Sequence, residues 1–230
     1  MVNIIVSNKK WHKNYIHEIE AKTNSTIIYI DDKSLVTYEI LKKYSPKYIF
    51  FPHWSNIISE EIYKKFECVI FHMTDLPFGR GGSPLQNLIA RGIYETKVTA
   101  LRCEKDLDAG DIYLKMPLSL QGAAEEIYLR AAELTKDMMI EMINKDFQPK
   151  KQEGKVVSFK RRKPEDGNIG NLQELQKIFD YIRMLDADSY PRAFLNTKNL
   201  HLEFERATLK NGYINADVKI ALRTGNDEEK

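Results

Sequence analysis

Two side chains that can exchange protons follow two predicted strands in the first half of the chain. An apolar run over residues 68–71 predicts a short buried strand, and His72 stands at its carboxyl end. A second predicted strand, residues 97–103, leads into an acidic turn that contains Asp108 and can fold back toward the histidine. In open α/β sheets, chemistry is done beyond the carboxyl ends of strands. We therefore predict that His72 and Asp108 form an acid/base pair.

Turn-forming residues fill the segment that follows His72. Gly79, Gly81 and Gly82 surround Arg80, and glycines allow a close approach of the backbone and positive φ angles. Arg80 has two equal interpretations: it contacts a substrate, or it folds back to hold the loop. A helix over residues 83–91 is predicted after this loop.

The spacing of these residues resembles the signature of the folate-dependent formyltransferases. The family includes glycinamide ribonucleotide, methionyl-tRNA and nucleotide-sugar N-formyltransferases, and the altered loop after the histidine is most similar to the sugar enzymes. The residues that carry the resemblance are His72, Pro77, Arg80-Gly81, Pro84, Gly92, Thr96, Val98-Thr99 and Leu107-Asp108-x-Gly110-Asp111.

The resemblance implies a reaction and a set of site residues. A formyl group moves from N10-formyltetrahydrofolate, the cosubstrate, to an amine, with His72 and Asp108 as catalytic residues and no metal. It also implies folate contacts at Pro52, Trp54, Ser55, Leu107 and Asp111.

One position departs from the family pattern. The family has an asparagine two positions before the histidine, and this chain has Ile70 there, which has no group to donate to a developing oxyanion. Charged His72, a backbone N–H or the loop from His53 to Asn56, which follows another predicted strand, could supply the donor instead. We expect His72 to act as the donor, with His53 as a further catalytic residue that helps it.

The implied substrate is a nucleotide-linked amino sugar. Substrate contacts are expected from Arg80, Gly81 and the basic residues Arg161, Arg162 and Lys163, because arginine suits bidentate contacts with oxyanions. The formal net charge is only +2, and the C-terminal region is short and barely charged, so nucleic acid is not expected as a partner. The alternatives are a methionyl-tRNA formyltransferase-like enzyme and a non-catalytic module that binds folate or a nucleotide.

Strands that alternate with helices predict an α/β fold. The expectation is a Rossmann-like, mostly parallel sheet with the formyltransferase fold in residues 1–150. Residues 151–230 are predicted to form a small C-terminal region with a linker, a basic loop, a helix over 172–185 and a β-hairpin, which Asn211-Gly212 marks.

Composition narrows the setting of the protein. Two cysteines, Cys68 and Cys103, stand inside predicted strands, which favours buried thiols over a disulfide framework or a metal site. No stretch reaches the roughly 20 apolar residues of a membrane span, so we expect a cytoplasmic protein with no membrane partner. The apolar C-terminal helix or the hairpin could form a homodimer contact.

Overall fold

The computed structural model describes residues 1–188 and 190–223. Contacts divide the chain into two compact units that alternate along the sequence. The first unit contains Met1–Pro84, Glu95–Ser119 and Leu129–Phe159, and the second contains Leu85–Tyr94, Leu120–Tyr128 and Lys160–Lys230. The predicted domain boundary at residue 150 stays a prediction.

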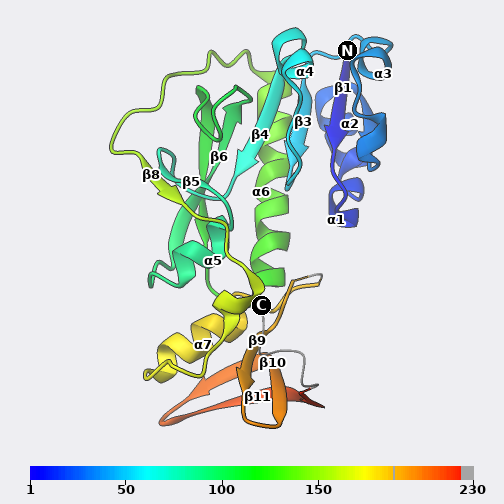
Figure 1. The fold of residues 1–230 in the computed structure, drawn as a ribbon. Helices are drawn as coiled ribbons and strands as arrows, with labels where there is room; N and C mark the ends of the chain where they lie inside the picture. The colour runs from blue at the N-terminus through cyan, green and yellow to red at the C-terminus, as the bar shows by residue number, and fades with distance from the viewer. Residues whose placement is uncertain (189, 224–230) are drawn as a thin grey trace. The chain divides into compact units, whose positions relative to one another are not determined.

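A six-stranded sheet forms the centre of the first unit, in the order β2-β1-β3-β4-β6-β7. Its strands β1, β3, β4 and β6 are labelled in Figure 1. Neighbours from β2 to β4 are parallel, whereas β6 is antiparallel to both β4 and β7. This arrangement confirms the predicted mostly parallel α/β fold. The strands are β1 (Val2–Val6), β2 (Thr26–Ile30), β3 (Ile49–Pro52), β4 (Cys68–His72), β6 (Glu95–Arg102) and β7 (Ile112–Ser119).

The central strands are mostly apolar because a parallel sheet is covered on both faces. Every residue of β3 is buried, and Phe51 belongs to a core cluster with Ile4, Ile49 and Cys68. Cys68 and Cys103 are both buried and free, as the sequence predicted.

Short helices connect the first four strands, and a long one follows β7. They are α1 (Lys10–Lys13), α2 (Ile16–Thr23), a 3-10 turn (Lys33–Leu35), α3 (Tyr38–Lys42), α4 (Glu60–Lys65) and α6 (Ala124–Asn144). Thr37 begins α3 by accepting a hydrogen bond from the Ile40 amide, which is the usual task of a threonine N-cap. None of the helices in the described ranges is long and apolar enough to cross a membrane.

A two-stranded parallel sheet lies outside the central one. It pairs β5 (Phe78–Gly81), in the glycine-rich loop, with β8 (Val157–Phe159). The segment expected to be a linker precedes β8, and its Lys150 exchanges two backbone hydrogen bonds with Ile112, at 2.7 and 2.9 Å. The chain therefore returns to the glycine-rich loop about 78 residues later in sequence.

The second unit contains α5 (Pro84–Ile89), whose first residue still belongs to the first unit. It also contains a 3-10 turn (Pro164–Gly167), α7 (Leu175–Arg183) and a separate antiparallel sheet. This sheet has the order β11-β10-β9, with β9 (Ala193–Asn196), β10 (Leu200–Lys210) and β11 (Tyr213–Leu222). The predicted helix and hairpin are present, and Gly212 has a φ of +84° in the hairpin turn. Strand β9 is an addition that the sequence reasoning missed.

Candidate active site

His72 lies at the end of β4 with its ring almost entirely enclosed. The residue is 7% exposed, and its Nε2 lies 2.8 Å from the carbonyl oxygen of Gly79. A carbonyl oxygen can only accept, so Nε2 carries the hydrogen of this bond. In the neutral ring, Nδ1 is therefore the unprotonated nitrogen and is able to accept a proton.

Asp108 faces that nitrogen. Its Oδ2 lies 3.5 Å from Nδ1 of His72 and accepts a hydrogen bond of 2.9 Å from the amide of Gly81. Asp108 has a φ of +53°, a left-handed conformation that aspartate tolerates better than most residues. Within the described residues, its Oδ1 accepts no hydrogen bond.

The turn reaches His72 by folding back along the sheet. Strand β6 is antiparallel to β4, and the amide of Cys103 bonds to the carbonyl of Cys68, at the end of β4 remote from His72. The two strands do not end at the same edge, so the turn after Cys103 must return over the length of β4. Gly110 permits this course, since a Cβ there would lie 2.0 Å from the carbonyl oxygen of Arg102.

Two other glycines bring the β5 loop close to its neighbours. A Cβ on Gly79 would lie 2.7 Å from the side chain of Thr74, and one on Gly81 would lie 2.4 Å from the carbonyl oxygen of Phe159. Both have positive φ angles, +83° and +107°. The loop can therefore present the Gly79 carbonyl to His72 and the Gly81 amide to Asp108 only with glycine at these positions.

Polar contacts hold the start of the same loop. Buried Thr99 on β6 donates a 2.7 Å hydrogen bond to the carbonyl of Thr74. The next residue, Asp75, forms ion pairs with Lys97, at 3.0 Å, and with Lys115. Burial alone would raise the pKa of the Asp75 carboxyl, but the hydrogen bonds and charges of the two lysines outweigh it and lower that pKa.

Arg80 contacts a residue that the sequence reasoning did not single out. Its Nε and Nη2 both donate to Oε1 of Gln152, at 3.1 and 2.8 Å. Nε2 of Gln152 donates to the carbonyl oxygens of Asp108 and Gly110, at 2.8 and 2.9 Å. Gln152 stands among lysines, with another glutamine four positions earlier, and this local sequence carries no signal of such a contact.

His53 lies at the same edge of the sheet as His72, because Pro52 on β3 pairs with Phe71 on β4. It has a φ of +51°, and its ring meets the edge of Trp11 at 5.9 Å between centroids. Burial, with help from the charge of Lys9, lowers the pKa of His53 to about 4. The imidazole is therefore neutral at pH 7.

Ile70 and Trp54 lie on the core side of this edge. Both pack against the core cluster that contains Phe51. Nε1 of Trp54 is buried and lacks a hydrogen-bond partner within the described part of the chain, as does Nε1 of Trp11. Buried donors without partners are uncommon, so these two mark a place for an acceptor.

The remaining predicted folate residues differ in exposure. Pro52 is buried, Ser55 is exposed, and Leu107 is 71% exposed, although it adjoins Asp108. Asp111 is half-buried, and its carbonyl accepts a 2.8 Å hydrogen bond from the amide of Arg102.

The predicted basic residues belong to the second unit. Arg161 and Lys163 are exposed, whereas Arg162 is half-buried, with its guanidinium 5.1 Å from the centre of the Tyr181 ring. Within the described residues, Arg161 and Lys163 form no ion pair with a carboxylate.

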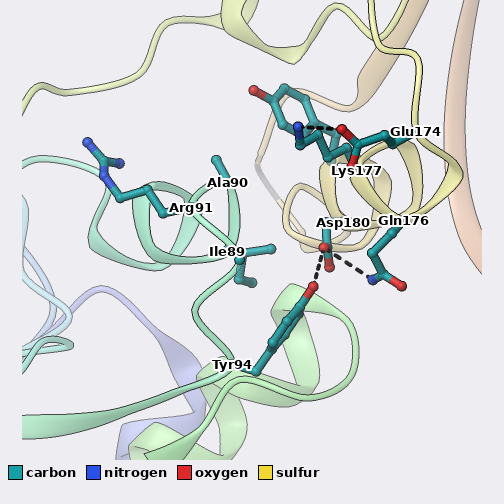
Figure 2. Close-up of a pocket in the computed structure, with 10 residues that line it drawn as sticks. Ile89, Ala90, Arg91, Tyr94, Glu174, Gln176, Lys177 and Asp180 are labelled. Carbon is teal, nitrogen blue, oxygen red and sulfur yellow. Dashed lines mark hydrogen bonds and ion pairs between the residues drawn. The ribbon is translucent and has the colours of Figure 1, made fainter.

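A cavity of about 240 Å³ lies within the second unit, between the end of α5 and α7 (Figure 2). Its one buried carboxylate, Asp180, accepts hydrogen bonds from Tyr94 at 2.8 Å and Gln176 at 3.2 Å and pairs with Arg183 at 2.7 Å. In these bonds the Asp180 carboxylate holds α7 in place, so we assign no catalytic or binding role to the cavity. Among the described residues, no group of three or more His, Cys, Asp or Glu side chains could hold a metal ion.

Comparison with known families decides the relationship. The sequence model described as "Formyl transferase" matches residues 17–143. The chain belongs to the formyltransferase family. A second model, described as "Methionyl-tRNA formyltransferase, C-terminal domain", matches residues 164–221 of this formyltransferase.

Three relatives show how far the likeness extends. The structure of methionyl-tRNA formyltransferase from Clostridium thermocellum is 48% identical, with a TM-score of 0.93 over 97% of this chain and 100% of that one. Methionyl-tRNA formyltransferase from Thermotoga maritima is 28% identical over 71% of this chain and 55% of its own length, so the chain spans about half of that curated relative. A sugar N-formyltransferase from Shewanella, 18% identical with a TM-score of 0.66 over 86% of this chain and 93% of that one, shares the fold.

These comparisons correct two predictions. The predicted nucleotide-sugar substrate is wrong, and so is the predicted lack of a nucleic-acid partner, because the chain is 48% identical, over 97% of its length, to a methionyl-tRNA enzyme. The charge argument failed because a balanced total does not report the local distribution of cations. The size of the C-terminal region failed as a criterion because the Clostridium protein is covered completely by this chain.

Proposed function

We propose that this chain is an N-formyltransferase that moves the formyl group of N10-formyltetrahydrofolate to the amino group of methionyl-tRNA. The observation that carries the proposal is the 48% identity to the Clostridium thermocellum methionyl-tRNA formyltransferase over nearly the whole of both chains. The enclosed His72–Asp108 pair supports the reaction type.

The formyl donor is assigned to the edge of β3 and the Asp108 turn. N10-formyltetrahydrofolate supplies an acyl carbon bonded to nitrogen, and its ring system offers nitrogen and oxygen acceptors. The buried, unpartnered Nε1 of Trp54 fits such an acceptor. Pro52, Ser55, Leu107 and Asp111 complete the proposed contacts.

His72 is the proposed base. The attacking amine must lose a proton, and Nδ1 is the ring nitrogen that the Gly79 contact leaves unprotonated. Asp108, 3.5 Å away, stabilises the imidazolium that forms. The imidazolium then returns this proton to N10 of tetrahydrofolate as the bond between N10 and the formyl carbon breaks. Oδ1 of Asp108 is able to accept the amine's second hydrogen, directly or through water.

His53 is the proposed donor to the oxygen that gains negative charge. Ile70 occupies the family's asparagine position and has no donor, whereas His53 follows β3 beside β4. Because its pKa is about 4, His53 is neutral at pH 7 and donates through a single ring N–H. Removing one such donor elsewhere costs roughly 10²- to 10³-fold in turnover.

The substrate's phosphates are assigned to cations. Arg161 and Lys163 are exposed and Arg162 lies beside them, so this group provides positive charge to a nucleic-acid backbone. Arg80 and Gly81 are further proposed contacts of the substrate. Charge reversal at Arg161 should raise KM for tRNA and leave kcat unchanged, with a shallower salt dependence.

The test is formylation in vitro with purified protein. It is incubated with N10-formyltetrahydrofolate and either methionyl-tRNA or a panel of nucleotide-linked amino sugars, and the product is identified by a 28-dalton gain. Formylmethionyl-tRNA from the wild type, and none from His72→Ala, is expected. His17→Ala, on the exposed side of α2, is the matched control. An inactive wild type, or an active His72→Ala, would refute the proposal.

A further inference from the structure

The segment before β8 contacts the candidate site through the side chain of Gln152. Gln152 is half-buried and makes four hydrogen bonds of 2.8 to 3.1 Å: two accepted from Arg80 and two donated to the carbonyls of Asp108 and Gly110. Its side chain therefore connects the glycine-rich loop to the Asp108 turn.

The oxygen and the nitrogen of the Gln152 side-chain amide bind different segments of the chain. The carbonyl oxygen of Gln152 holds Nε and Nη2 of Arg80, and within the described residues Nη1 of Arg80 has no partner, so its hydrogens stay available to an anion. The amide nitrogen holds the carbonyls on both sides of Ala109. A side chain with both a donor and an acceptor is needed, which glutamine supplies and glutamate does not.

The Asp108 turn depends on these hydrogen bonds for its conformation. Asp108 is left-handed, Gly110 touches the backbone of β6, and Leu107 is 71% exposed, so few apolar contacts hold the turn from outside. Among the residues that the structure describes, one hydrogen bond joins the turn directly to the loop, from the Gly81 amide to the Asp108 carboxylate. A loss of the Gln152 contacts would therefore loosen that bond and the alignment of Asp108 with His72.

We propose that Gln152 is a positioning residue that sets the catalytic carboxylate and the Arg80 guanidinium at once. This role rests on the proposed function, because it acts through Asp108. Gln152 makes no contact with the reacting atoms, so its effect falls on kcat through Asp108 and on anion binding through Arg80.

Gln152→Glu removes the hydrogen-bond donor of the side chain and keeps its acceptor. The carboxylate still accepts from Arg80, but it cannot donate, and it repels the carbonyls of Asp108 and Gly110. We expect kcat to fall at least about tenfold in Gln152→Glu, and Gln152→Ala should lower kcat and raise KM for methionyl-tRNA as well. Gln148→Glu, an exposed glutamine four positions earlier, is the matched control and should keep wild-type kinetics.

Hydrogen exchange gives a readout that does not depend on activity. In Gln152→Glu, exchange at the Gly81 amide should speed up at least about tenfold, because its acceptor is the Asp108 carboxylate. The backbone amides of Lys150 and Ile112 each donate to the carbonyl of the other residue, and both amides should stay protected from exchange. Their protection would show that the segment before β8 keeps its position.

Each outcome decides the proposal. Unchanged kcat in Gln152→Glu, or unchanged Gly81 exchange, refutes positioning. Lost protection at Lys150 also refutes it, since Gln152 would then only dock the segment. An inactive wild type refutes the formyltransferase proposal instead. In that case, hydrogen exchange at the Gly81 amide still tests whether Gln152 positions Asp108.

Discussion

Replacement of Asp108 by Asn tests the charge of the proposed pair. Asparagine has nearly the same shape, and its side-chain oxygen can still accept the 2.9 Å hydrogen bond from Gly81. The substitution therefore removes the negative charge beside His72 and leaves the turn in place.

The magnitude follows from the geometry. Oδ2 lies 3.5 Å from Nδ1, and both side chains are less than a tenth exposed. At an effective dielectric constant of about 20, a unit charge pair at this distance is worth roughly 4–5 kcal/mol. Some of this is recovered by the amide dipole and by water, so we expect kcat to fall about 10²- to 10³-fold.

The assay is turnover at saturating formyl donor and methionyl-tRNA, with the melting temperature measured in parallel. Asp106→Asn is the control, because Asp106 is exposed in the same turn and bonds to Ala109 only through its backbone carbonyl. If Asp108→Asn kept kcat within about threefold of the wild type, the charge would not stabilise the imidazolium, and the assignment would fail.

Three further predictions concern other parts of the first unit. His53→Ala should lower kcat roughly 10²-fold, and Ile70→Asn in that background should restore part of it; full activity in His53→Ala would exclude its donor role. Burial lowers the pKa of His12 to about 3, so only the unfolded chain takes up this proton as the pH falls below 6.5, and stability is lost down to about pH 3. His12→Gln should reduce that loss by about 1.4 kcal/mol per pH unit below 6.5, measured by urea denaturation, and an unchanged slope would contradict the burial argument. Gly110→Ala should cost about 1–3 kcal/mol of stability and most of the activity, because its Cβ would meet the Arg102 carbonyl; wild-type melting would show that the backbone can move aside.

The sequence by itself predicted the fold and the proximity of His72 to Asp108, whose side chains lie 3.5 Å apart; the acid/base role of this pair stays a prediction. An apolar strand that ends in His72 and a turn around Asp108 are local patterns, and local patterns determine strands and turns. The glycines at 79, 81 and 110 were visible for the same reason, because a backbone conformation or a close approach that excludes a side chain leaves a glycine in the sequence.

Only the tertiary structure decided how the site is held together. Strand β6 runs antiparallel to β4, so the Asp108 turn reaches His72 by folding back rather than by ending at the same edge. The contact of Gln152 with Arg80, 72 residues away, depends on the pairing of β5 with β8. A hydrogen bond between distant segments requires no periodicity and no turn residue at either end, so neither segment records it in its own sequence.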